Sequence, residues 1–137
     1  MKRALLGRVT RDEAFLKARF RGGVLDFDSG GSLRLVVDTG FSGAVSLPAD
    51  RVRELQLDRL GVETYELADG ATVEVAAYRG TVIALGRRLE LPVLALGSDP
   101  LVGMQFLHAV AGRVQFDLRG GILRLIPLSR RGRRSAR

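Results

Sequence analysis

The chain has 137 residues, a length that fits one domain of ordinary size and is too short for two. It contains no cysteine, which excludes disulfide frameworks, thiol catalysis and thiolate zinc sites. Its only histidine is His108, so a Ser-His-Asp triad or a histidine-based zinc site would depend on that one residue. We therefore expect neither kind of site, no metal and no cofactor.

Positive charge is concentrated at the C-terminal end. The formal net charge is +7 at pH 7, and residues 130–137 contain five arginines and no acidic residue. The remaining residues are close to neutral, which disfavours nucleic acid as a partner of the folded part. We expect residues 1–129 to fold and residues 130–137 to form a basic, disordered tail. This tail would either improve solubility or bind an acidic partner.

The chain lacks a predicted membrane segment. No apolar run approaches the roughly 20 residues that a spanning helix requires. The apolar stretch near Met1 ends at Gly7, which is too short for the apolar part of an export signal. The sequence therefore predicts a cytoplasmic protein with no membrane partner.

From residue 15 to residue 47, apolar and polar residues mostly alternate, and turn residues recur about every ten positions. An alternation with period two is typical of short β-strands. The strands predicted here are 15–20, 24–27, 33–37 and 44–47. One helix follows, over 49–55, because Pro48 precedes it and the apolar residues Val52 and Leu55 are spaced for one helix face.

The second half of the chain again predicts strands. Segments 64–67 and 72–78 form a hairpin around Asp69-Gly70, a dipeptide suited to the positive φ angles of a tight turn. A short helix is predicted over 104–109. The further strands are 81–85, 91–96, 113–116 and 121–126. The fold class is therefore all-β with one or two short helices in a single domain.

The segment with the clearest chemical signal is Asp38-Thr39-Gly40, which directly follows the apolar strand 33–37. An ionisable residue at the end of a buried strand is costly unless it is paired or functional. Gly40 permits a tight turn and a close approach by another group, and Thr39 offers a hydroxyl. The bare tripeptide is common enough to be an ordinary turn, so its context decides the interpretation.

In that context, residues 33–48 resemble the active-site loop of retropepsin-like aspartic peptidases. Ala68, Asp69 and Gly70 lie where that family has its flap hairpin. Leu101, Val102 and Gly103 match the hydrophobic-hydrophobic-glycine element that the family packs beside the catalytic loop. The resemblance covers about residues 7–126 and is closest to prokaryotic single-domain members with an Asp-Thr-Gly-Phe motif. It implies a closed acid-protease barrel.

The resemblance also implies a mechanism with two carboxylates, although this chain has one Asp-Thr-Gly. Two copies would therefore meet across a two-fold axis, each contributing Asp38. Two carboxylates so close share one proton, so that one activates a water and the other polarises the peptide carbonyl. By the same resemblance, Thr39 would lock the two loops together, Gly40 would let them approach, and Phe41 and Ser42 would contact the substrate.

One position departs from the family pattern. The third residue after the aspartate is usually small, yet here it is Phe41, and Ser42 stands one place too late to serve as the usual hydroxyl partner of the carboxylate. Two hypotheses follow: an aspartic endopeptidase working as a homodimer on peptide or protein substrates, or a non-catalytic dimeric peptide-binding module with the same fold. A third hypothesis is that the chain binds nucleic acid or an acidic partner through its arginine tail.

The other polar residues are predicted to be structural. His108 is expected on a helix surface or in the core. Four further aspartates stand near predicted turns and are interpreted as turn residues: Asp26, Asp28, Asp99 and Asp117.

Overall fold

The computed structural model describes residues 4–128. Within that range the chain forms eleven strands and two helices. The strands are β1 (Leu5–Val9), β2 (Ala14–Arg21), β3 (Val24–Asp26), β4 (Leu33–Val37), β5 (Val45–Leu47), β6 (Asp58–Glu66), β7 (Thr72–Ala84), β8 (Arg87–Ala95), β9 (Leu101–Val102), β10 (Arg113–Asp117) and β11 (Ile122–Ile126). The helices are α1 (Ala49–Leu55) and α2 (Met104–Val110).

Seven strands close into a barrel. The hydrogen-bonded path runs β2-β3-β7-β8-β5-β9-β4, and β4 pairs again with β2. Most neighbours are antiparallel, but β3–β7, β5–β8 and β4–β9 are parallel. Closure of this kind removes free strand edges and leaves an interior that side chains fill. The prediction of a mostly β, single-domain barrel with two short helices is confirmed.

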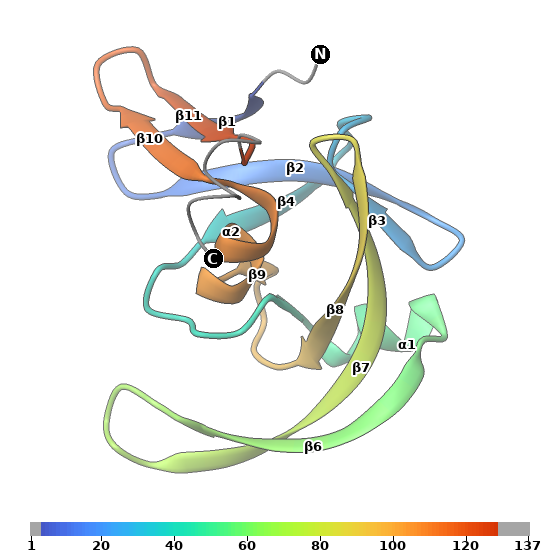
Figure 1. Cartoon of the computed structure of the whole chain (residues 1–137). Helices are drawn as coiled ribbons and strands as arrows, with labels where there is room; N and C mark the ends of the chain where they lie inside the picture. Colours follow the sequence, from blue (N-terminus) through green and yellow to red (C-terminus); the bar gives the residue numbers. More distant parts are fainter. Residues whose placement is uncertain (1–3, 129–137) are drawn as a thin grey trace, which may run out of the picture.

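Two groups of strands extend beyond the barrel. β1, β11 and β10 continue the sheet from β2, with β10 outermost. On the other side β6 pairs with β7 alone, and the two form a long hairpin. Figure 1 shows this hairpin curving beneath the barrel, while β10, β11 and β1 lie above it.

The core lies inside the barrel and against α2. The rings of Phe27 and Phe106 lie 4.9 Å apart at its centre. Phe106 and Val110 of α2 are fully buried, so this helix covers barrel residues such as Leu35 and Val102. Burying aromatic and aliphatic side chains of this size is the main stabilising contribution to a domain of this length.

The predicted bounds of β4 and α1 agree with the structure, and most other strands differ by a few residues. The hairpin prediction was wrong in length. β6 begins at Asp58, and segments 72–78 and 81–85 belong to one strand, β7. β7 continues through Gly80. Glycine is required at this position because a side chain there would overlap Val93 of the neighbouring strand.

Two further strands, β1 and the two-residue β9, were not predicted. Leu5, Gly7 and Val9 face inward, and glycine in the middle hides the alternation. The predicted disordered tail, 130–137, lies outside the described residues. Within residues 4–128, no helix is long and apolar enough to cross a membrane.

Candidate active site

The position of Asp38 is determined by the pairing of β4 with β9. The two strands run parallel, with Val36 opposite Leu101 and Val37 opposite Val102. The backbone N–H of Asp38 then donates to the carbonyl of Val102 at 2.9 Å, which extends the ladder by one residue. The next bond closes a turn, because the N–H of Phe41 donates to the carbonyl of Asp38 at 3.1 Å. Asp38 therefore marks the point where the strand leaves the barrel.

Gly103 and the start of α2 hold the loop after Asp38 from the other side. The N–H of Gly103 donates to the carbonyl of Ala44 at 3.0 Å. The N–H of Met104 donates to the carbonyl of Phe41 at 2.8 Å, so a free N–H at the helix start is satisfied by the loop. A Cβ at position 103 would overlap the carbonyl oxygens of Phe41 and Gly43. Only glycine allows this approach.

The structure thus brings together two segments that lie more than sixty residues apart in the sequence. Leu101 and Val102 contribute the strand, and Gly103 provides the space that the loop requires. The family resemblance indicated that residues 101–103 pack beside the Asp38 loop. In the structure the two segments lie side by side.

Asp38 as a whole residue is half-buried. Its Oδ1 accepts a hydrogen bond from the N–H of Gly40 at 2.9 Å, and within residues 4–128 it shares no hydrogen bond with a second carboxylate. Thr39, Gly40 and Ser42 are exposed. The hydroxyl of Thr39 makes no side-chain hydrogen bond in the described part of the chain, so it is available to a second molecule. The loop therefore presents one oriented carboxylate and an unused hydroxyl on an open surface.

Phe41 is buried, with 8% of its surface exposed. It belongs to a small apolar cluster separate from the barrel core, together with Val75, Ala77 and Leu94. Its ring lies 6.1 Å from that of Tyr65 on β6. The bulky side chain that departs from the family pattern thus anchors the β6–β7 hairpin to the Asp38 loop.

Tyr65 is a residue of this site that the sequence analysis did not identify. Its hydroxyl donates to Glu63 Oε1 at 3.0 Å. Burial, together with the hydrogen bond and negative charge of Glu63, raises the pKa of Tyr65 to about 12. It therefore stays a neutral phenol at physiological pH. An aromatic at an alternate position of a predicted strand was the available signal, but nothing in the sequence connected it with Phe41.

The hairpin tip is formed by Leu67 to Ala71 and is exposed. Gly70 has a φ of 88°, and its N–H donates to the carbonyl of Leu67 at 2.9 Å. Asp69 Oδ1 accepts from the N–H of Ala71, also at 2.9 Å. Ala68 and Asp69 thus shape the turn that the sequence predicted. In Figure 1 the hairpin passes beneath the loop after β4.

Other polar residues are structural, as predicted. Burial opposes ionisation of Asp26, but hydrogen bonds from the Ser29 hydroxyl and from the N–H groups of Ser29 and Asp28 outweigh it and lower its pKa. Asp28 accepts from the N–H groups of Leu85 and Gly86, both at 2.7 Å.

Asp117 forms part of the last turn, where its Oδ1 accepts from the N–H of Gly120 at 2.8 Å. Asp99 and His108 are exposed, the latter on α2. Among residues 4–128, no group of three or more His, Cys, Asp or Glu side chains is arranged to hold a metal ion.

Comparison with models of known protein families, with curated proteins and with solved structures finds no significant match. The function is therefore inferred from the site itself.

Proposed function

We propose that the chain is one subunit of a homodimeric aspartic endopeptidase, with Asp38 from each copy forming the catalytic pair. One observation carries the proposal: the half-buried residue Asp38 follows β4 at a point that β9 and Gly103 hold from the opposite side. Such a double constraint on an otherwise exposed loop is what a catalytic group needs in order to be positioned.

The chemistry follows from bringing two such loops together. Two carboxylates about 3 Å apart share one proton, because both cannot ionise at that distance. The ionised Asp38 then acts as general base on a water, and the water oxygen attacks the peptide carbonyl carbon. The protonated Asp38 donates to the carbonyl oxygen, and the proton taken from water passes to the leaving amine as the C–N bond breaks. No cofactor is required.

The substrate would be an extended peptide segment. The β6–β7 hairpin is fastened to the Asp38 loop through Phe41 and Tyr65, close to its exposed tip at Ala68, Asp69 and Gly70. A hairpin tip held beside the loop in this way can close over a peptide and exclude water from the reacting bond. The exposed Ser42 offers backbone and hydroxyl groups beside the carboxylate.

A second function is favoured by one observation. Phe41 occupies space between the Asp38 loop and the hairpin, and in the described residues Ser42 makes no hydrogen bond to the Asp38 carboxylate. A carboxylate supported only by the N–H of Gly40 has fewer groups to hold it in an active geometry. The alternative is therefore a dimeric module that binds peptides without cutting them.

Replacing Asp38 with Asn separates the two functions. The wild-type protein is incubated with a peptide library, and new amino termini are quantified. The peptidase proposal expects cleavage that Asp38→Asn reduces by about 10³-fold or more, with peptide binding retained. The matched control is Asp12→Asn in an exposed turn, which should cleave as well as wild type. Peptide binding by wild type without any cleavage supports the alternative.

A further inference from the structure

β10 has an unpaired edge. It is the outermost strand of the path β10-β11-β1-β2, and within residues 4–128 no strand pairs with its second side. Alternate backbone N–H and C=O groups of Arg113–Asp117 therefore point away from β11. An open edge of this kind is a template for pairing with another strand.

The core-facing side of β10 is also left uncovered. Val114 lies opposite Leu125 and Phe116 lies opposite Leu123 in the ladder with β11. Directly opposed residues share one face of a sheet, and Leu123 and Leu125 are fully buried. Phe116 therefore projects from the face that forms the core, yet 47% of its surface is exposed. The apolar face of this sheet therefore extends to Phe116, beyond the part that other elements of the chain cover.

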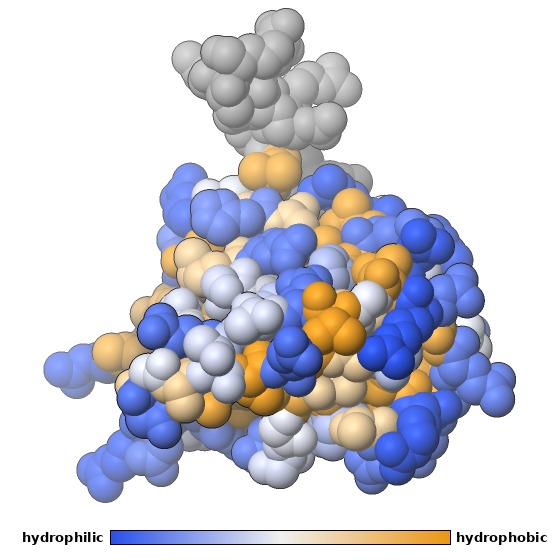
Figure 2. Space-filling model, turned by 90° about the horizontal axis from the view of Figure 1, so that it is seen from below, coloured by the Kyte–Doolittle hydropathy of each residue, from blue (hydrophilic) through white to orange (hydrophobic). Residues whose placement is uncertain are grey.

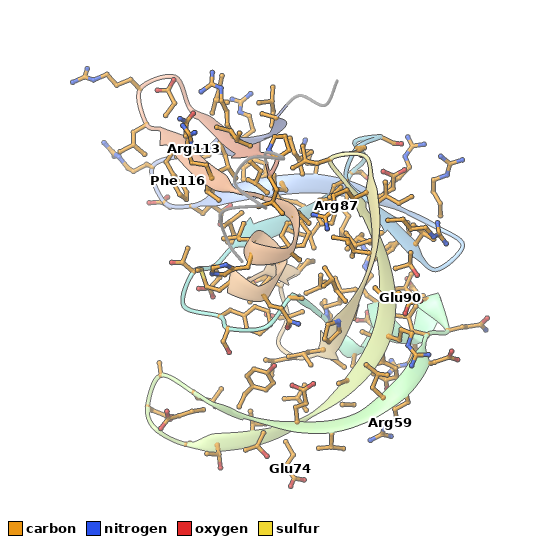
Figure 3. The ribbon with its side chains drawn as sticks, in the orientation of Figure 1. Arg59, Glu74, Arg87, Glu90, Arg113 and Phe116 are labelled. Carbon is orange, nitrogen blue, oxygen red and sulfur yellow. The ribbon has the colours of Figure 1, made fainter. Side chains whose placement is uncertain are left out.

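A groove of about 260 Å³ lies next to Phe116 and reaches the Asp38 loop. Its lining is largely apolar, with Met104 and Leu107 of α2 on one side and Val114 of β10 on the other. Thr39, the residue after Asp38, lines the same groove. Figure 3 shows Phe116 and Arg113 on β10, at the opposite end of the molecule from Glu74 on the hairpin.

We propose that β10 and this groove form the subunit interface, with β10 antiparallel to β10 of a second copy and Gln115 on the two-fold axis. The choice of a second copy as occupant rests on the proposed function. Two Asp38 carboxylates that share a proton place the axis beside Thr39. Thr39 lines the groove, so the groove lies next to this axis, where the second copy would cover it.

The sequence of β10 is complementary to itself in this register. Arg113 lies opposite Asp117 of the partner subunit, and Val114 lies opposite its Phe116. Opposite charges and apolar side chains that face each other across an antiparallel pair are stabilising. Centring the pair on Phe116 instead would place Arg113 opposite a second arginine, Arg119.

The charges needed for this pairing are available. Arg113 forms no ion pair within residues 4–128, where the salt bridges involve other residues. Asp117 accepts one bond from the N–H of Gly120 and lies 3.9 Å from Arg124. A carboxylate has further acceptor sites, so Arg113 of the partner subunit can join this group.

Cross-linking through Gln115→Cys tests the register. The chain has no cysteine of its own, so any disulfide must join two copies of the introduced residue. Residues opposed on the axis of an antiparallel pair have Cα atoms about 4.5–5.5 Å apart, within the range that a disulfide spans. Mild oxidation of the full chain should convert most of Gln115→Cys to a covalent dimer. The control Glu74→Cys, on the exposed hairpin, should form no covalent dimer under the same conditions.

Phe116→Asp tests the apolar part of the interface. Each dimer loses two buried rings, so sedimentation velocity should show a dimer dissociation constant raised by about 100-fold or more. Leu6→Asp is the matched control, since Leu6 is 59% exposed on β1 outside the groove. It should leave the dimer unchanged. A wild-type chain that stays monomeric, or a dimer that Phe116→Asp leaves unchanged, overturns the interface.

The same samples separate the interface from the peptidase proposal. A dimer that cross-links at Gln115→Cys but cleaves no peptide supports the interface and contradicts the peptidase. Peptide cleavage by wild type without cross-linking at Gln115→Cys supports the peptidase and overturns the interface.

Discussion

The barrel and the β6–β7 hairpin differ in how they are held. Barrel residues such as Leu16, Leu35 and Leu47 are fully buried, and each barrel strand, β7 included, has a neighbour on both sides. β6 has one neighbour, and none of its residues is fully buried. Figure 2 views the molecule from the hairpin side and shows apolar side chains among charged ones. On the hairpin, three apolar residues are more than 40% exposed: Leu60, Val62 and Leu67.

This difference assigns separate tasks to the two regions. Asp38 leaves the barrel where β4 pairs with β9, beside the fully buried Val102, and backbone hydrogen bonds of both its N–H and its C=O hold its position. β6 packs on the loop through Tyr65, but β6 and the exposed tip contribute no buried residue to the core, and segments with few buried contacts open at low free-energy cost. The small apolar cluster of Phe41, Val75, Ala77 and Leu94 connects the Asp38 loop with the hairpin, and we call it the joint. The predictions below test this separation at fixed protein concentration, because dimerisation also changes apparent stability.

The largest effect is expected in the barrel. Leu35→Ala removes a fully buried side chain and should lower the free energy of unfolding by about 4 kcal/mol. The hairpin counterpart Leu60→Ala, at a side chain 49% exposed, should change it by no more than about 0.5 kcal/mol. Urea unfolding followed by circular dichroism measures both. Similar losses in the two variants would contradict the contrast between barrel and hairpin.

Phe41→Ala should loosen the joint. Loss of this ring should reduce stability by about 2–3 kcal/mol, less than the usual cost in a barrel core because its cluster is small. Hydrogen exchange should become faster in β6 and β7 while β2 and β4 stay protected. If protection is lost equally across the barrel, Phe41 belongs to the main core instead of the joint.

Asp26→Asn, in the barrel, should lower the free energy of unfolding by a smaller amount that depends on pH. Hydrogen bonds lower the pKa of Asp26 below its ordinary value of 3.8, so ionisation stabilises the folded state above that pH. We expect the variant to be about 1–2 kcal/mol less stable at pH 7. This difference should shrink as the pH falls below 3.8, since the carboxylate becomes protonated. A difference that is constant from pH 3 to pH 7 would contradict this assignment.

The smallest effect concerns the hairpin at alkaline pH. The pKa of Tyr65 is raised from 10.0 to about 12, so its neutral form stabilises the folded state below pH 10 and the contribution is lost as the pH rises through 12. Absorbance titration should show a late phenol ionisation that disappears in Tyr65→Phe. Glu63→Gln should move this ionisation to lower pH, because it removes the charge that opposes it. An unchanged titration in both variants would contradict the assignment.

Much of the barrel could be predicted because its strands carry local signals. Strand 33–37 and helix 49–55 have clear periodicity and were predicted with the bounds that the structure shows. The contact between the Asp38 loop and Gly103 depends on a motif with a strict steric requirement, and the resemblance indicated it.

The hairpin and its joint could not be predicted in the same way. β6 is exposed on both faces, so no alternation marks its first half. The burial of Phe41 depends on Tyr65, which lies 24 positions away and is brought close only by the long ladder between β6 and β7. β10 was predicted as a strand, but its free edge became visible only in the sheet order.

The most direct test of the central claim is a subunit-mixing titration with a peptide that the wild type cleaves. Asp38→Asn subunits are added to a fixed amount of wild type, and the rate of hydrolysis is measured after exchange. If Asp38 acts as a pair, mixed dimers are inactive, and a ninefold excess of the variant should reduce the rate to about a tenth. A rate that stays constant across the titration would mean that one subunit suffices, which would contradict the shared Asp38 pair.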